Sequence, residues 1–101
     1  MQQKESVKVS GPLRKMLESR GWLTIKMHGN KYQSGIPDLY CTHPEHGHKW
    51  IETKLASGSL TRSQRAMFKK LTDHGDSVYV IFDPNTVFEV IFNKPNWWKW
   101  L

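Results

Sequence analysis

Residues 51–54 read Ile-Glu-Thr-Lys, so Glu52 and Lys54 are two positions apart. In a β-strand such residues share one face, because successive side chains alternate. A carboxylate can hold a hard divalent cation, and a nearby ammonium group can orient a water molecule or neutralise charge in a transition state. Hydrolysis of a phosphodiester needs a positioned water molecule and neutralisation of the phosphate charge, and these groups can supply both. The same Glu-x-Lys pair is also typical of a solvated surface strand.

The segment 35–39, Gly-Ile-Pro-Asp-Leu, makes the pair informative. Asp38 begins a short strand predicted over 38–41, and Glu52 lies in the strand predicted over 49–55. A turn over 43–48 joins the two strands, so we expect Asp38 within reach of Glu52. Two carboxylates that lie close together could share one divalent cation.

The remaining pattern predicts the elements that hold these residues. A helix fills the N-terminal third and ends near Arg20, with Gly21 as its stop. The triplet Ser10-Gly11-Pro12 either kinks a long helix or begins a shorter one. Strands are predicted at 22–27, 38–41, 49–55, 77–82 and 86–92, with a helix from Thr61 to about His74. The order α-β-β-β-α-β-β over one domain, 1–101, indicates an α/β fold with a mixed sheet flanked by helices.

The second predicted helix begins with Thr-Arg-Ser-Gln, the pattern of a capping box. Gln64, Met67, Phe68 and Leu71 share one face of this helix. A polar side chain therefore lies on the face that packs against the sheet. Gln64 either completes the cap alone or also reaches the carboxylates.

The composition suits one small, basic domain. The chain has 101 residues, with 15 Lys and Arg against 9 Asp and Glu, and a net charge of +6. This charge favours a nucleic-acid partner, although a basic surface can also be merely solvated. The single cysteine allows no internal disulfide, and no signal peptide or membrane-spanning run is visible. We expect a soluble, cytoplasmic protein with no membrane partner.

The motifs Gly-Ile-Pro-Asp-Leu, Trp-Ile-Glu-Thr-Lys and Leu-Thr-Arg-Ser-Gln occur in this order. Together they resemble the VRR-NUC branch of the PD-(D/E)XK nucleases over roughly residues 5 to 82. The resemblance implies a restriction-endonuclease-like fold and DNA cleavage that depends on Mg²⁺ or Mn²⁺, with no nucleotide cofactor. Stand-alone members of this size imply a phage or prophage protein that resolves Holliday junctions, which are four-way branched DNA, as a homodimer.

The resemblance also implies roles for individual residues. Asp38 and Glu52 would be metal ligands, the backbone carbonyl of Thr53 a third ligand, and Lys54 the group that positions or activates water. Gln64 matches the glutamine that the family carries on its helix. The family places a further glutamate on its first helix. Glu5 fits that position, whereas Glu18 lies about 140° around the helix from Leu13 and would face solvent.

Basic residues near these motifs are candidate DNA contacts. Lys26, His28 and Lys31 precede the Gly-Ile-Pro-Asp motif, and Arg62 and Arg65 lie in the first turn of the second predicted helix. Each could equally be a solvated surface residue.

Three alternatives remain open from the sequence. The run Cys41, His43, His46 and His48 could bind zinc, although a solvated hairpin tip with a buried cysteine fits its close spacing better. The terminal Trp97, Trp98 and Trp100 could pack on the domain, form a dimer contact or stack on DNA bases. The protein could also nick linear or flapped DNA, or bind DNA without cutting it.

Overall fold

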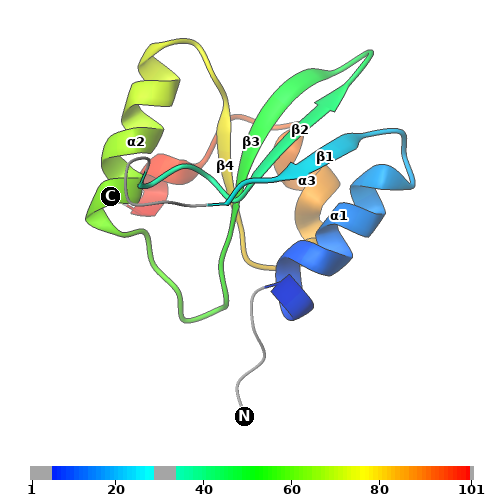
Figure 1. Ribbon diagram of the computed structural model, residues 1–101, viewed down its shortest axis with the longest axis horizontal. Coiled ribbons are helices and arrows are strands. Elements are labelled where there is room, and N and C mark those ends of the chain that lie inside the picture. The colour runs from blue at the N-terminus through cyan, green and yellow to red at the C-terminus, as the bar shows by residue number, and fades with distance from the viewer. Residues whose placement is uncertain (1–5, 29–33, 101) are drawn as a thin grey trace.

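The computed structural model describes residues 6–28 and 34–100. In these segments four strands form one sheet in the order β1-β2-β3-β4 (Figure 1). The strands are β1 (Leu23–Lys26), β2 (Leu39–His43), β3 (Gly47–Thr53) and β4 (Val78–Ile81). The first three strands pair antiparallel, and β4 pairs parallel to β3. Helix α2 (Arg62–Asp73) provides the crossover that a parallel pair requires.

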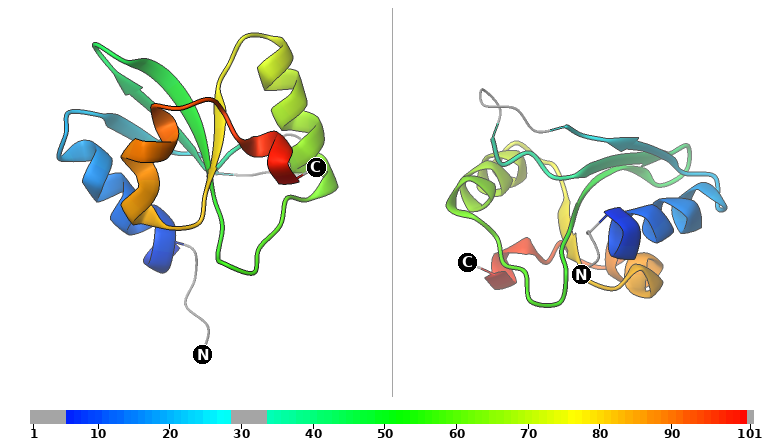
Figure 2. Two further views of the ribbon diagram at one scale, coloured as in Figure 1. Left: turned by 180° about the vertical axis from the view of Figure 1, so that it is seen from behind. Right: turned by 60° about the horizontal axis from the view of Figure 1, so that its bottom comes forward.

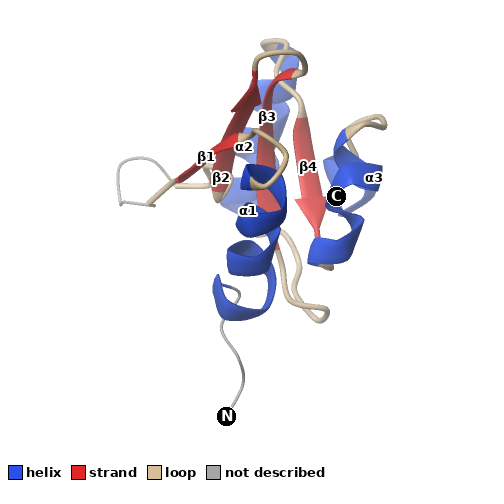
Figure 3. Cartoon of the chain, turned by 90° about the vertical axis from the view of Figure 1, so that its right-hand side faces the viewer, coloured by secondary structure: helices blue, strands red, loops and turns tan. Residues whose placement is uncertain are grey.

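Helices cover both faces of the sheet (Figure 2). Helices α1 (Gly11–Glu18) and α3 (Val87–Ile91) pack on one face, and α2 packs on the other with the 3₁₀-helix η3 (Trp97–Trp100). Seen from the side of α1, helix α2 lies behind the strands (Figure 3). One core cluster contains Leu13, Leu17, Trp22, Leu39, Cys41, Ile51, Tyr79, Ile81, Val87 and Ile91, and the other contains Leu60, Phe68, Val78, Val80 and Trp97. The predicted mixed sheet flanked by helices is therefore confirmed.

The N-terminal helical segment takes the longer of its two predicted forms, because the chain is already helical before Ser10-Gly11-Pro12 and Ser10 itself has helical dihedral angles. Helix α1 starts at Gly11 with Pro12 in its first turn, where the missing N–H of proline costs nothing. A single π-helical stretch, η1 (Ser6–Ser10), precedes it. Gly21 adopts a φ of 88° just after the helix and turns the chain into β1. Leu13 and Leu17 on the inner face of α1 are fully buried.

The expected strand over 86–92 is wrong, because this segment is helical. Asp83 accepts a hydrogen bond from the N–H of Asn85 and begins η2 (Pro84–Thr86), which leads directly into α3. The apolar residues Val87 and Ile91 are four positions apart, so a helix buries both against the sheet. Helical periodicity and the cap outweigh the β-propensity of valine and isoleucine. The element order is therefore α-β-β-β-α-β-α.

The outer edge of β4 is occupied by a side chain. Asn96 accepts a hydrogen bond from the N–H of Val80 through Oδ1 at 2.7 Å and donates to its carbonyl through Nδ2 at 3.0 Å. The amide thus mimics one residue of a neighbouring strand. This contact closes the exposed edge that a sheet otherwise offers to other chains.

The tryptophan-rich C-terminus packs on its own domain. Trp97 is buried, contacts Phe68 and donates a hydrogen bond from Nε1 to the hydroxyl of Thr72 at 2.8 Å. Trp100 packs against Phe82, whereas Trp98 remains 42% exposed. Within the described residues, no helix has both the length and the apolar character needed to cross a bilayer.

Candidate active site

Asp38 and Glu52 lie together, as their motifs predict. Leu39 pairs with Ile51 across the β2–β3 ladder, so the preceding Asp38 comes opposite Glu52. The backbone N–H of Asp38 donates to Oε1 of Glu52 at 3.2 Å. The hairpin therefore fixes two carboxylates next to each other at one end of the sheet.

Thr53 holds the Asp38 carboxylate in place. Oδ2 of Asp38 accepts hydrogen bonds from the backbone N–H of Thr53 at 2.9 Å and from its hydroxyl at 2.6 Å. Sequence reasoning considered only the carbonyl of Thr53 and missed this hydroxyl. The available signal was a polar residue at a core position of a buried strand, since Thr53 has no exposed surface.

Lys54 and Gln64 both reach the other oxygen of Glu52. The Lys54 ammonium nitrogen lies 3.3 Å from Oε2, and Nε2 of Gln64 donates to the same oxygen at 2.8 Å. Lys54 follows the last residue of β3, but its N–H still donates to the carbonyl of Ile81 on β4. This bond continues the ladder and keeps Lys54 on the side of Glu52.

Helix α2 gives Gln64 its position. Thr61 accepts a hydrogen bond from the N–H of Gln64 at 3.1 Å, and Oε1 of Gln64 accepts one from the N–H of Thr61 at 2.9 Å. This reciprocal pair is the expected capping box. Because its Oε1 serves the cap and its Nε2 serves Glu52, Gln64 fills both of the roles that the sequence left open.

Gly35 allows the Gly-Ile-Pro-Asp loop to lie against the start of α2. Its φ is 88°, a conformation that glycine adopts without strain. A Cβ at this position would collide with the carbonyl group of Ser63 and would lie 3.1 Å from the N–H nitrogen of Gln64. Only glycine therefore permits this close approach, which brings Asp38 and Gln64 to the same site.

The charge on Glu52 is unfavourable in this environment. Glu52 is 2% exposed, and burial, as the largest cause, raises its pKa from 4.5 to about 7. The Asp38 carboxylate raises this pKa as well, while Lys54 and the Asp38 N–H oppose the change. Two adjacent carboxylates with one ammonium group nearby are a donor set that fits a hard divalent cation. A cation there would favour the ionised form of both acids.

The two carboxylates are the acidic ligands that the described residues offer. Within residues 6–28 and 34–100, no group of three His, Cys, Asp or Glu side chains could hold a metal ion. Mg²⁺ commonly binds through one or two carboxylates and completes its shell with waters and phosphate oxygens. Oxygen ligands of this kind do not require a third carboxylate.

Of the two first-helix glutamates, Glu5 lies outside the described residues. Glu18 accepts a hydrogen bond from the hydroxyl of Thr24 on β1 at 2.6 Å and lies 3.9 Å from Arg14. Its side chain is 50% exposed, in agreement with the solvent-facing position expected for it. Glu18 therefore binds β1 rather than the Asp38–Glu52 pair.

The candidate DNA contacts differ in how close they lie to the Asp38–Glu52 pair. The N–H of Met27 donates to the carbonyl of Asp38, so Lys26 at the end of β1 and the exposed His28 lie close to the motif. Lys31 falls outside the described residues. Arg62 is exposed at the start of α2. Arg65 donates from Nη1 to the carbonyl of Leu60 at 2.9 Å, so part of its guanidinium braces the loop before α2.

The zinc alternative has no support in the geometry. Cys41 is fully buried, and burial is the main cause that raises the pKa of its thiol to about 12. A cysteine binds zinc as the thiolate, which this environment disfavours. His43 accepts a hydrogen bond from the N–H of Glu45 through Nδ1, and His46 packs on Trp22. The hairpin tip with a buried cysteine is the arrangement that the structure contains.

Comparison with known proteins agrees with this fold. The family model described as the VRR-NUC domain matches residues 13–82 of the 101. No curated protein matches the chain. A solved structure of a VRR_NUC domain superposes with a TM-score of 0.74 at 20% identity, covering 86% of this chain and 94% of its own. The structural likeness establishes the fold, and the family model spans well over half of the chain. The protein therefore belongs to the VRR-NUC family, whose domains have a nuclease-type function in DNA processing.

Proposed function

We propose that this protein is a metal-dependent endodeoxyribonuclease whose active site contains Asp38, Glu52 and Lys54. The observation that carries this proposal is the convergence on Glu52. The Asp38 N–H binds one oxygen of this carboxylate, while Lys54 and Gln64 bind the other. Burial of the Glu52 and Lys54 charges next to Asp38 costs hydration energy, and costly arrangements of this kind, with a perturbed pKa, cluster at functional sites.

The residues divide the work as their chemistry suggests. Asp38 and Glu52 would hold Mg²⁺ or Mn²⁺, with the Thr53 carbonyl as a third ligand and Glu5, which lies outside the described residues, as a further one. When bound, the cation neutralises phosphate charge and lowers the pKa of a coordinated water. The Lys54 ammonium group would orient that water and stabilise negative charge in the transition state. Gln64 would keep Glu52 in a fixed orientation.

We further propose that the substrate is branched DNA, such as a four-way junction, and that the enzyme acts as a homodimer. The motif resemblance to stand-alone nucleases supports the substrate. A two-fold axis would place two such sites on two strands, as symmetric resolution requires. The edge strand β1 supports the dimer, since its Leu23 and Ile25 are 59% and 44% exposed. Among the described residues, no strand pairs with the outer edge of β1, and exposed apolar residues on such an edge are suited to pairing with another chain.

Cleavage assays test the proposal directly. A labelled four-way junction, a flap and a linear duplex are incubated with Mg²⁺, with Mn²⁺ or with EDTA. We expect paired, symmetric nicks in the junction, abolished by EDTA and by Asp38→Asn or Lys54→Ala. Lys69 and Asp73 form an exposed ion pair at 2.7 Å, so Lys69→Ala and Asp73→Asn are matched controls that should retain cleavage. Cleavage of the flap or the linear duplex alone would mean that the enzyme is a nuclease whose substrate is not a four-way junction. Tight DNA binding without any cleavage would overturn the nuclease assignment.

The oligomeric state tests the dimer separately. Light scattering coupled to size exclusion should give twice the chain mass for the wild type and the monomer mass for Ile25→Lys. A monomeric wild type that still resolves junctions would remove the dimer from the proposal and leave the active site intact.

A further inference from the structure

A pocket lies far from the candidate active site. It has a volume of about 440 Å³ and is lined by Arg20, Trp22, His43, His46, Phe88 and Phe92. Trp22 and Phe88 pack with the α1 and α3 side of the sheet, whereas Gln64 reaches Glu52 from α2 on the other side. The histidines come from the β2–β3 hairpin end, and Glu52 lies five residues along β3 from Gly47, or about 16 Å. This pocket therefore takes no part in the site described above.

Aromatic rings form most of the pocket wall. The His46 ring lies nearly parallel to the buried Trp22 ring, at an interplanar angle of 12° and a centroid distance of 5.8 Å. Phe92 meets His46 edge-on at 4.9 Å and is itself 51% exposed. Phe92 also stacks toward Phe88, at an interplanar angle of 16° and a centroid distance of 6.5 Å, and the exposed half of its ring is available to a ligand at the rim of the pocket. The shape and chemistry of the wall suit a flat, aromatic group.

The rim of the pocket carries a positive charge. The guanidinium of Arg20 lies 4.4 Å from the centre of the Phe88 ring, which holds this exposed group in place. A stacked arginine keeps its in-plane N–H groups available for a phosphate. Among the described residues that line the pocket, none is acidic. An anion attached to a flat ring therefore fits both the wall and the rim.

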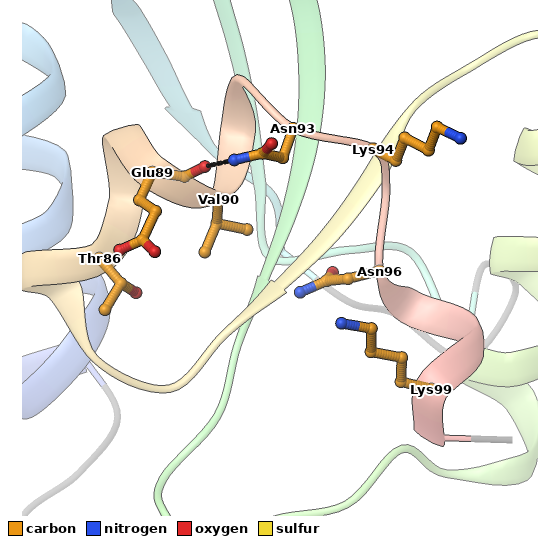
Figure 4. Close-up of a pocket in the computed structure, with 7 residues that line it drawn as sticks. All are labelled: Thr86, Glu89, Val90, Asn93, Lys94, Asn96 and Lys99. Carbon is orange, nitrogen blue, oxygen red and sulfur yellow. Dashed lines mark hydrogen bonds between the residues drawn. The ribbon is translucent and has the colours of Figure 1, made fainter.

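A different hollow, between α3 and η3, lacks this selectivity (Figure 4). Its lysines, Lys94 and Lys99, share the wall with Glu89, so its charges are mixed. Asn96, which also lines it, already uses its amide on Val80. The aromatic pocket is thus the hollow whose chemistry selects one class of ligand.

We propose that this pocket binds an unpaired nucleotide of single-stranded DNA, with the base against Phe92 and His46 and the phosphate at Arg20. The inference rests on the DNA-processing function of the family and not on metal-dependent cleavage. Stacking on aromatic side chains accepts any base, because every base has a π-face. Bases in a duplex are already stacked and paired, so the pocket favours single strands.

Binding of a short fluorescent oligothymidylate, measured by anisotropy in EDTA, tests the proposal. Comparison probes are a strand of the same length made of abasic nucleotides and a duplex of the same length. The wild type should bind oligothymidylate at least about fivefold more tightly than the abasic strand. Phe92→Ala should remove this preference, and Arg20→Ala should weaken the binding of both single strands.

Control variants exclude indirect effects. Phe92→Leu keeps apolar bulk at the position, so it should fold like the wild type and still lose the preference for bases. Lys15→Ala removes an exposed cation outside the pocket and should leave binding unchanged. A base preference that survives in folded Phe92→Ala would overturn the inference while leaving cleavage with Mg²⁺ intact. A wild type that cuts no DNA but prefers bases through Phe92 would support this site and remove the proposed cleavage.

Discussion

At the scale of single residues, the candidate site is organised around one carboxylate. Glu52 receives an N–H from Asp38, an amide from Gln64 and the ammonium group of Lys54. Each of these residues is identifiable in the sequence, because acid, lysine and glutamine stand at informative spacings. The hydroxyl of Thr53 escaped detection, although the one signal for it was a polar residue between Ile51 and Leu55 on the apolar face of the strand.

Thr53→Val should weaken the site while preserving the shape of the strand. Valine has the volume of threonine but cannot donate the 2.6 Å hydrogen bond to Asp38. A bond to a charged group contributes about 1.5–3 kcal/mol, so cleavage and metal affinity should fall roughly ten- to hundredfold. Single-turnover rates and metal titration by calorimetry measure both effects. Thr53→Ser should restore them, whereas Thr86→Val removes an exposed hydroxyl bond to Asp83 and should change neither. Unaltered metal affinity in Thr53→Val would contradict the positioning role.

At the scale of elements, sequence periodicity predicted the sheet and both longer helices. The capping box of α2 and the end of this helix near His74 were predictable, because cap and turn residues have local physical requirements. The segment after Asp83 was misassigned, since five residues of α3 are too few to separate a helix from a strand by periodicity. Its conformation is set by the cap and by burial of Val87 and Ile91, and burial depends on the complete fold.

The two members of the capping box should separate stability from activity. Thr61→Ala removes the cap and should lower the free energy of unfolding by about 1 kcal/mol. Gln64→Ala removes the cap and also the hydrogen bond to Glu52. Both variants should melt at similar temperatures, but only Gln64→Ala should cut DNA at least about tenfold more slowly. Equal cleavage rates for folded Thr61→Ala and folded Gln64→Ala would mean that Gln64 acts only as a capping residue.

Gly35→Ala should damage the fold and the site together. The left-handed conformation costs an alanine about 1–2 kcal/mol, and the collision with Ser63 adds about 1–3 kcal/mol. Gly75→Ala is a matched control, because Gly75 has a φ of 95° and no atom within 4 Å of a Cβ. Denaturant unfolding should show the larger loss for Gly35→Ala, and cleavage should fall in that variant alone. Comparable losses in the two variants would mean that the loop can move away from α2.

At the scale of the whole molecule, the sheet has two unlike edges. The edge of β4 is closed by the amide of Asn96, while β1 at the other edge exposes Leu23 and Ile25. Composition predicted a basic domain, and the family match agrees with the DNA partner that its charge favours. The closing of β4 could not be predicted, because an asparagine sixteen residues away along the chain carries no strand signal.

Asn96→Ala should therefore open the β4 edge. Two backbone groups of Val80 lose their partners, which should lower the free energy of unfolding by about 1–3 kcal/mol. Light scattering at increasing protein concentration should reveal association through the freed edge. Asn93→Ala removes a hydrogen bond from the side-chain amide to the Glu89 carbonyl at an exposed position, and this variant should not associate. An Asn96→Ala protein as stable and as dispersed as the wild type would show that water can replace the amide.

The hydrogen bond from the N–H of Lys54 to the carbonyl of Ile81 makes the position of Lys54 depend on the pairing of β4 with β3. The β2–β3 hairpin can form early, because its partners are close in sequence, but parallel pairing with β4 must wait for the α2 crossover. Asp38 and Glu52 can thus meet before Lys54 is anchored. During synthesis on the ribosome, the chain cannot become a competent nuclease until β4 has emerged and joined the sheet.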